Sequence, residues 1–280
     1  MENLTLGIEI EYRDLNRKNV DKYIEEKHPT WTSKIEDAIS KGAPNPFIGG
    51  EIVSPILKNT PSSWQELTEI CNFLIVNHAS PLNTGAHIHI GANILENNSS
   101  YLLRFIKLWC SYEHVIYRFS FGEYIYARDT LFDYSPPVGK ELKYLMQVLN
   151  LKDTDSFDYL LTVLNLGKKR GLNLSNINQD EKKNTIEFRC PNGTFNKDIW
   201  YNNFLLFTRM LEYAKNNDYN EDLINRKLLE EHDPTQNNID LENATELANL
   251  IYPSEKERLL FLKQYLKGYE ETKEYKLARI

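Results

Sequence analysis

The sequence has little cysteine and no excess of basic residues, and both deficits narrow the class of protein. Three cysteines among 280 residues, an odd number without a close pair, favour a reducing compartment over a disulfide-stabilised secreted fold. The formal net charge of -7 argues against general nucleic-acid binding, which normally requires a basic surface. We therefore expect a cytoplasmic protein that binds no nucleic acid.

Long apolar segments and phosphate-binding loops are also missing. No apolar run approaches the roughly 20 residues of a membrane-spanning helix, and the N-terminus lacks the apolar core of a signal peptide, so no membrane association is expected. Neither Gly-x-x-x-x-Gly-Lys-Ser/Thr nor Gly-x-Gly-x-x-Gly occurs, which excludes recognisable P-loop and Rossmann nucleotide sites. A bound nucleotide would therefore have to lie on a sheet surface, held through metal ions.

Three short stretches alternate polar and apolar residues with the period of a β-strand. They are Gly-Ile-Glu-Ile-Glu-Tyr (7–12), Gly-Ala-His-Ile-His-Ile-Gly (85–91) and Thr-Ile-Glu-Phe-Arg (185–189). Residues two apart share a face of a strand, so the apolar members point into a core. The other face carries Glu9 and Glu11, His87 and His89, and Glu187 and Arg189. These residue types are those of divalent-cation and phosphate sites, and the repetition predicts a functional face.

The glutamates of these stretches, together with Glu51, raise an electrostatic question. If Glu9, Glu11, Glu51 and Glu187 converge, each pair of carboxylates about 4 Å apart repels by roughly 4 kcal/mol at an effective dielectric constant of 20. A fold would not hold such a cluster ionised without cations. Either the four residues are separate solvated side chains, or they bind metal.

The His-Ile-His stretch allows two kinds of metal site. Neutral imidazole is a common zinc ligand. A cupin-type site, however, requires a glutamate three or four residues after its His-x-His, and residues 90–94 contain no carboxylate. A metal-dependent amidohydrolase wants further histidines on strands, whereas His28, His78, His114 and His232 lie off strand-like segments. Imidazole supplementing oxygen ligands of Mg2+ or Mn2+ is the better interpretation.

Arg189 and Arg170 are candidate phosphate clamps, because guanidinium is permanently charged and binds oxyanions with two hydrogen bonds. The alternatives are an ion pair with a neighbouring glutamate for Arg189 and a solvated basic turn for Arg170, which follows Lys168 and Lys169.

The remaining pattern predicts a mixture of strands and helices. We expect a helix over 19–26, strands over 31–39 and 51–57, and a helix introduced by a capping box at Ser63 and Glu66. Composition shifts to Asn, Asp, Glu and Lys near residue 216, and Ser254 with Glu257 forms a second capping box. The domains expected are 1–215, catalytic, and 216–280, a helical extension packed on the core.

Five motifs in one order resemble the amidoligase family of the glutamine synthetase and glutamate–cysteine ligase superfamily of carboxylate–amine ligases. The three alternating stretches are joined by Gly-Glu-Ile-Val-Ser-Pro (50–55) and Arg-Gly-Leu-Asn-Leu (170–174), and Asn-Gly-Thr (192–194) follows the last. The resemblance runs from Gly7 to about Met210. It implies an α+β fold, with an antiparallel sheet curved into an open half-barrel, helices on the convex side, and ATP with two or three Mg2+ or Mn2+ ions on the concave side.

The resemblance also implies roles for individual residues. The implied metal ligands are Glu9, Glu11, Glu51, His87 and Glu187. The implied nucleotide contacts are His89, Arg170 and Asn173, and the implied catalytic residues are Glu51, Glu187 and Arg189, the last at the transferred phosphate or the substrate. Trp31 and Asp37 match a Trp and an Asp that precede the second motif in related chains, and the loops after Gly42 and around Asp129 are candidate lids.

We therefore predict an ATP- and Mg2+-dependent carboxylate–amine ligase that forms an amide or isopeptide bond through an acyl phosphate, from small-molecule or peptide carboxylates and amines. One alternative is a catalytically inert relative that binds a nucleotide or peptide, for which Mg-ATP binding without turnover would be diagnostic. The other is a metal-dependent hydrolase, for which chelator-sensitive amide cleavage without ATP would be diagnostic.

Overall fold

The computed structural model describes residues 4–36, 39, 48–164, 166–178, 184–236 and 238–267. Within them, an antiparallel sheet of seven strands, not closed into a barrel, has the order β2-β3-β1-β5-β7-β6, with β4 beside β1. The strands are β1 (Thr5–Asn16), β2 (Thr32–Lys34), β3 (Ile48–Val53), β4 (Leu57–Lys58), β5 (Ala86–Gly91), β6 (Leu172–Asn173) and β7 (Thr185–Phe188). This confirms a mixed fold with an open antiparallel sheet.

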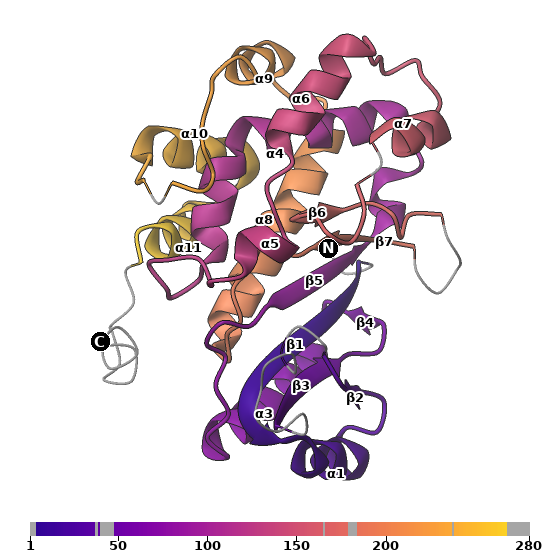
Figure 1. Cartoon of the computed structure of the whole chain (residues 1–280). Coiled ribbons are helices and arrows are strands. Elements are labelled where there is room, and N and C mark those ends of the chain that lie inside the picture. Colours follow the sequence, from indigo (N-terminus) through magenta and orange to yellow (C-terminus); the bar gives the residue numbers. More distant parts are fainter. Residues whose placement is uncertain are drawn as a thin grey trace.

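Helices back one face of this sheet (Figure 1). The helices of the described residues are α1 (Arg17–Lys27), α3 (Pro61–Val76), the 3-10 helix η1 (Ala92–Leu95), α4 (Ser99–Ser120), α5 (Leu131–Tyr134), α6 (Gly139–Val148), α7 (Phe157–Leu164), α8 (Lys197–Lys215), α9 (Glu221–Lys227), α10 (Leu241–Ile251) and α11 (Glu255–Tyr265). In the view of Figure 1, α3 and α8 pass behind the strands, and α8 contacts both α3 and β5. No helix in the described ranges is both long and apolar enough to cross a bilayer.

The apolar members of the alternating stretches fill the core between the sheet and these helices. Ile8, Ile88 and Ile186 are at most 1% exposed. Phe188 stacks on Phe207 of α8 with ring centroids 4.0 Å apart, and Trp109 of α4 lies 5.8 Å from the Phe188 ring centroid. The predicted apolar face is thereby confirmed.

The N-terminal elements differ in detail from the pattern. The predicted strand over 31–39 is reduced to β2, and Asp37 and residues 40–47, which include most of the first candidate lid, lie outside the described residues. The strand expected over 51–57 splits into β3 and β4 at Ser54 and Pro55. Ser54 Oγ accepts the backbone N–H of Ile8 at 2.9 Å, and Pro55 has no N–H to continue the ladder.

The two predicted capping boxes have different outcomes. α3 begins at Pro61 behind the N-cap Thr60, whose Oγ1 accepts the N–H of Ser63 at 3.4 Å, so the box at Ser63 was placed three residues late. Glu66 instead accepts the indole N–H of Trp31 at 2.8 Å. At α11 the prediction is confirmed, because Ser254 Oγ accepts the N–H of Glu257 at 3.2 Å.

The helices after residue 216 pack on α4 and α8. Gln264 of α11 is fully buried and donates to the carbonyl of Phe119 at 3.2 Å and to Asn203 Oδ1 at 3.1 Å. Arg209 of α8 pairs with Glu257 of α11 at 2.6 Å. These contacts join the C-terminal helices to the two longest helices of the core.

Candidate active site

Strand register gathers the polar residues of the alternating stretches on one face. Glu11 lies opposite Glu51, Glu9 opposite His87, and His89 opposite Glu187. Asn173 of β6 lies opposite Glu187 on the other side. Directly opposed residues of antiparallel strands point to the same face, so five neighbouring strands build one polar surface. We call this surface the polar face.

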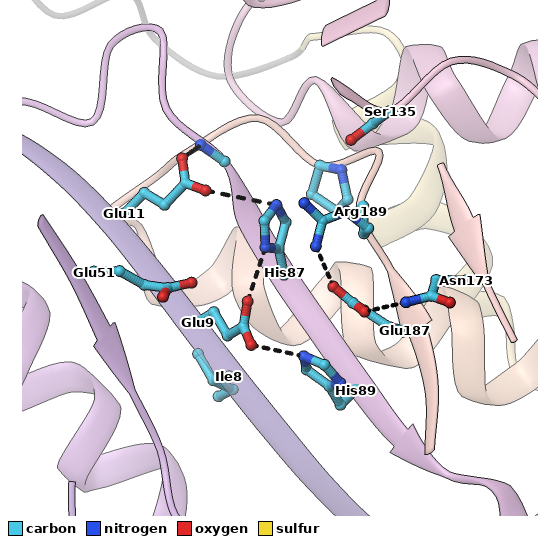
Figure 2. A network of polar contacts seen from close by, with 12 residues as sticks. Ile8, Glu9, Glu11, Glu51, His87, His89, Ser135, Asn173, Glu187 and Arg189 are labelled. Atoms are coloured by element: carbon cyan, nitrogen blue, oxygen red, sulfur yellow. Dashed lines mark hydrogen bonds and ion pairs between the residues drawn. The ribbon is translucent and has the colours of Figure 1, made fainter. Parts of the chain in front are cut away.

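Glu9 connects the two histidines of β5 (Figure 2). Its Oε2 lies 2.9 Å from His87 Nδ1, and its Oε1 lies 3.1 Å from His89 Nε2. Burial alone would raise the pKa of Glu9, but the hydrogen bonds and charges of both imidazoles outweigh it and hold the pKa below its usual range. Glu9 is therefore ionised at the centre of the polar face.

Glu11 lies two residues after Glu9 on β1, and the position of its side chain depends on Gly85. Its Oε2 accepts the backbone N–H of Gly85 at 2.5 Å, and its Oε1 lies 3.7 Å from His87 Nε2. A Cβ at Gly85 would come within 2.8 Å of that imidazole nitrogen and 3.1 Å of Glu11 Oε1. Glycine at this position allows both side chains to reach their places.

Glu51 is the most buried carboxylate of the polar face, at 2% exposure. Burial, and then the negative charge of Glu9, raise its pKa from an ordinary 4.5 to about 8. Lys34 of β2 lies opposite Glu51 in register, and its Nζ is 2.9 Å from Glu51 Oε2. Lys34 was not among the predicted site residues, and its place in the strand predicted over 31–39 was the only signal in the sequence for it.

Glu187 is held from two sides. Asn173 Nδ2 donates to its Oε2 at 2.6 Å, and Arg189 donates to its Oε1. Burial would raise the pKa of Glu187, but the charges of His89 and Arg189 lower it. Arg189 Nε is buried and, within the described ranges, has no hydrogen-bond partner. The ion pair foreseen for Arg189 thus exists and leaves part of its guanidinium free to bind an anion.

Two sets of metal-competent donors share Glu9. One contains Glu9, Glu51 and His87, and the other contains Glu9, His89 and Glu187; in each, one donor atom per residue lies within 4.8 Å of the others. The structure therefore groups His89, predicted as a nucleotide contact, with carboxylates. Glu11, predicted as a ligand, is in neither set, although it contacts His87.

Two cavities adjoin the polar face. The larger, about 610 Å3, has Glu9, His89, Asn173, Glu187 and Arg189 in its wall, with Lys34 and Lys168. The smaller, about 140 Å3, has Glu11, His87 and Arg189 in its wall, with Arg13 and Arg128. Arg189 lines both cavities.

Arg128 is a buried cation that the sequence analysis missed. It is 7% exposed, and its guanidinium donates to the carbonyls of Pro191 at 2.6 Å and Arg189 at 3.2 Å and approaches Ser135 Oγ at 3.4 Å. No carboxylate of the described residues lies within ion-pair distance of it, and burial lowers its pKa. It follows α4 in an irregular segment, where no periodic pattern marks it.

Arg170 lies away from the polar face, unlike the other predicted metal, nucleotide and catalytic residues that the structure describes. Its guanidinium pairs with Glu141 of α6 at 2.8 Å, and it lines neither cavity at the polar face. Lys168, two residues earlier, lines the larger one. Asp129, in the second candidate lid, accepts from Asn83 Nδ2 at 2.8 Å, beside two wall residues of the smaller cavity, Arg128 and Thr130.

A family model described as "Putative amidoligase enzyme" matches residues 31–211. The match includes Glu51, His87, His89, Arg170, Asn173, Glu187 and Arg189, and it begins after β1, so that Glu9 and Glu11 precede it. No curated protein matches the chain.

Proposed function

Because the chain belongs to the amidoligase family, we propose that it is an ATP- and Mg2+-dependent ligase that joins a carboxylate to an amine as an amide or isopeptide bond. We propose further that its open sheet is a glutamine-synthetase-like catalytic fold, and that the reaction passes through an acyl phosphate. Family membership supports ligase activity, and the geometry of the polar face supports the rest of the proposal.

The observation that carries the proposal is the position of Arg189. It lines both cavities, its pKa is held above the usual value by Glu187 despite burial, and its Nε has no partner within the described residues. A phosphoryl group transferred from a nucleotide in one cavity to an acid in the other would pass this guanidinium. Cations aimed at charge that develops in the transition state are a main source of catalysis.

The donors of the polar face fit divalent cations. Glu9, Glu51 and Glu187 supply carboxylate oxygens, with one imidazole in each of the two sets that share Glu9. Mg2+ and Mn2+ prefer oxygen ligands and accept occasional imidazole, so this donor set suits them. Bound there, such ions would neutralise charge on the β- and γ-phosphates during phosphoryl transfer.

The larger cavity fits the nucleotide. Its volume of about 610 Å3 lies within the usual range for small-molecule sites. Lys168 and Asn173 offer donors for phosphate oxygens, whereas Val53, Pro55 and Ile56 offer apolar surface for a base. The nucleotide would thus lie on the sheet surface, as the absence of a glycine-rich phosphate loop requires.

The smaller cavity fits the acid. Arg13 and Arg128 line it, and neither has a carboxylate within ion-pair distance among the described residues. A buried guanidinium without an anionic partner is costly, and a substrate carboxylate would relieve that cost. A volume of about 140 Å3 accommodates a small acid or the terminal residue of a peptide.

The reaction that we propose uses these positions in two steps. A carboxylate oxygen of the acid forms a bond to the γ-phosphorus of ATP, the bond to the bridging oxygen breaks, and ADP leaves. The amine next attacks the acyl carbon, phosphate leaves with the bonding electrons, and the amine loses a proton. Arg189 stabilises the transferred group in both steps, while the walls of the cavity limit hydrolysis of the acyl phosphate by water.

Hydroxylamine trapping tests this proposal. With ATP, Mg2+ and a panel of small acids and peptides, the protein should yield a hydroxamate together with ADP and phosphate. Glu9→Gln should abolish the signal, and Glu25→Gln, an exposed glutamate on α1, should leave it unchanged. AMP and pyrophosphate as products would refute the acyl phosphate, and Mg-ATP binding without turnover for any acid would favour the inert relative.

A further inference from the structure

A second group of metal-competent side chains lies away from the polar face. His114 projects from α4, His232 follows α9, and Asp240 is the N-cap residue of α10. None of the three lines either cavity at the polar face. Because the three residues are far apart in the sequence, they come together only through the packing of the C-terminal helices on α4.

The geometry of the group is compact. The imidazole rings of His114 and His232 stack with centroids 3.9 Å apart and planes at 17°. His114 Nε2 lies 3.2 Å from Asp240 Oδ2. One ligand atom from each of the three residues lies within 4.8 Å of the other two, whereas donors on a tetrahedral zinc ion are about 3.3 Å apart. A metal lies near the plane of each imidazole that binds it, so the two rings would have to turn out of their stack to close the group around an ion.

Neighbouring groups orient the three donors. Asp240 Oδ2 also accepts from Asn243 Nδ2 at 2.7 Å, and its Oδ1 accepts the backbone N–H of Asn243 at 3.0 Å. Glu230 Oε2 lies 3.1 Å from His232 Nε2, which leaves Nδ1 of that ring available to a metal. Histidine ligands of metals commonly hold their second ring nitrogen on a carboxylate in this way.

Among the carboxylates around the two histidines, Asp240 is the one without a lysine or arginine partner in the described residues. Lys227 Nζ pairs with Glu230 at 3.0 Å and with Glu246 at 3.3 Å, so both of these glutamates already have a cation. The carboxylate of Asp240 contacts only the side chains of His114 and Asn243 among the described residues. The side chains of His232 and Asp240 are 27% and 26% exposed, so an ion can enter from solvent.

We propose that His114, His232 and Asp240 bind a zinc ion, which fastens the segment between α9 and α10 to α4. Two imidazoles and one carboxylate form a donor set typical of zinc and unlike the oxygen-rich polar face. The ion would join the C-terminal helices to the core and would act on stability, with no part in the reaction proposed above.

Zinc titration of the metal-free, full-length protein tests this inference. In a Glu9→Gln/Glu187→Gln background, which weakens the polar face, one zinc ion per chain should bind and raise the melting temperature. Adding His232→Ala should weaken binding at least tenfold and remove the rise. His78→Asn, at an exposed histidine with φ 60, removes an imidazole elsewhere and should leave the affinity unchanged.

The location of the ion gives a result that does not depend on those variants. Crystals of the wild-type protein grown with zinc should show an anomalous scattering peak between His114, His232 and Asp240. A peak confined to the polar face, or equal zinc affinity with and without His232→Ala, would overturn the inference. Neither result would affect the ligase proposal, whose test uses Mg2+ and product analysis.

Discussion

Alternate residues of β5 and β7 enter two different environments. Ile88 and Phe188 face the helices, where Phe188 stacks on Phe207 of α8. His89 and Glu187, one residue away along the same strands, face the larger cavity. His89 contacts Glu9, and Glu187 accepts hydrogen bonds from Asn173 and Arg189. The apolar face gains free energy from burial, whereas the polar face keeps buried charges that only a ligand would fully compensate. The same strands thus serve stability on one face and, in the function proposed above, chemistry on the other.

Truncation of the apolar face should produce the largest loss of stability. Phe188→Ala removes a fully buried ring from between β7 and α8, and such truncations cost about 3–5 kcal/mol. Urea unfolding followed by circular dichroism would measure it. Glu51→Gln, on the polar face of β3, should instead leave the unfolding midpoint of the metal-free protein unchanged or higher at pH 8, because burial and the charge of Glu9 disfavour ionisation of this carboxyl and raise its pKa to about 8. If both variants unfold alike, the two faces do not divide their roles.

Truncation on the polar face should instead lower activity while the protein stays folded. Arg189→Ala should reduce hydroxamate trapping by about 100- to 1,000-fold, the usual loss for one electrostatic group of the transition state. ATP affinity, measured by calorimetry with Mg2+, should change far less, because the charge is needed at the transferring phosphate. Arg189→Lys should recover part of the rate. Equal losses in trapping and in ATP affinity would place Arg189 at the nucleotide alone.

The free energy of unfolding should also depend on pH, because the polar face contains a carboxyl with a shifted pKa, whereas the apolar face of the described strands contains no titratable group of this kind. The Glu51 carboxyl stays protonated in the folded protein up to a pKa of about 8, whereas the unfolded chain ionises near 4.5. Between these values the unfolded state binds fewer protons, so stability falls as pH rises. Glu51→Gln should flatten this slope in urea midpoints measured at pH 5, 6.5 and 8 with EDTA. Parallel slopes for the variant and the wild type would contradict the assignment.

Sequence periodicity predicted the polar face, because the alternation of polar and apolar residues is a local property of each strand. Alternation in three stretches determines which residues share a face, and the antiparallel register then brings Glu9, His87, His89 and Glu187 together. Side chains of irregular segments carry no such signal. Arg128, between α4 and α5, was therefore missed although it is buried beside the polar face.

Contacts between helices that are far apart in the chain could not be predicted from the sequence pattern either. His114 and His232 were set aside as metal ligands because they lie off strands, yet packing of the C-terminal helices on α4 brings their rings to 3.9 Å. The motif around Arg170 contains strand positions but no information on the packing of distant helices. Asn173 of this motif lies on the polar face, whereas Arg170 pairs with Glu141, an ion pair that depends on where α6 lies.

The smallest expected effect compares Lys168 with Arg170, two cations of one segment. Lys168 lines the larger cavity, whereas Arg170 pairs with Glu141 at 38% and 50% side-chain exposure. Lys168→Ala should weaken ATP binding several-fold, because one phosphate contact is lost. Arg170→Ala should change ATP affinity by less than about twofold and stability by at most about 1 kcal/mol, the range of exposed ion pairs. Calorimetry and urea unfolding of both variants give these values. If Arg170→Ala weakens ATP binding more than Lys168→Ala, the pair with Glu141 must open when the nucleotide binds, and the role that the motif implies for Arg170 is correct.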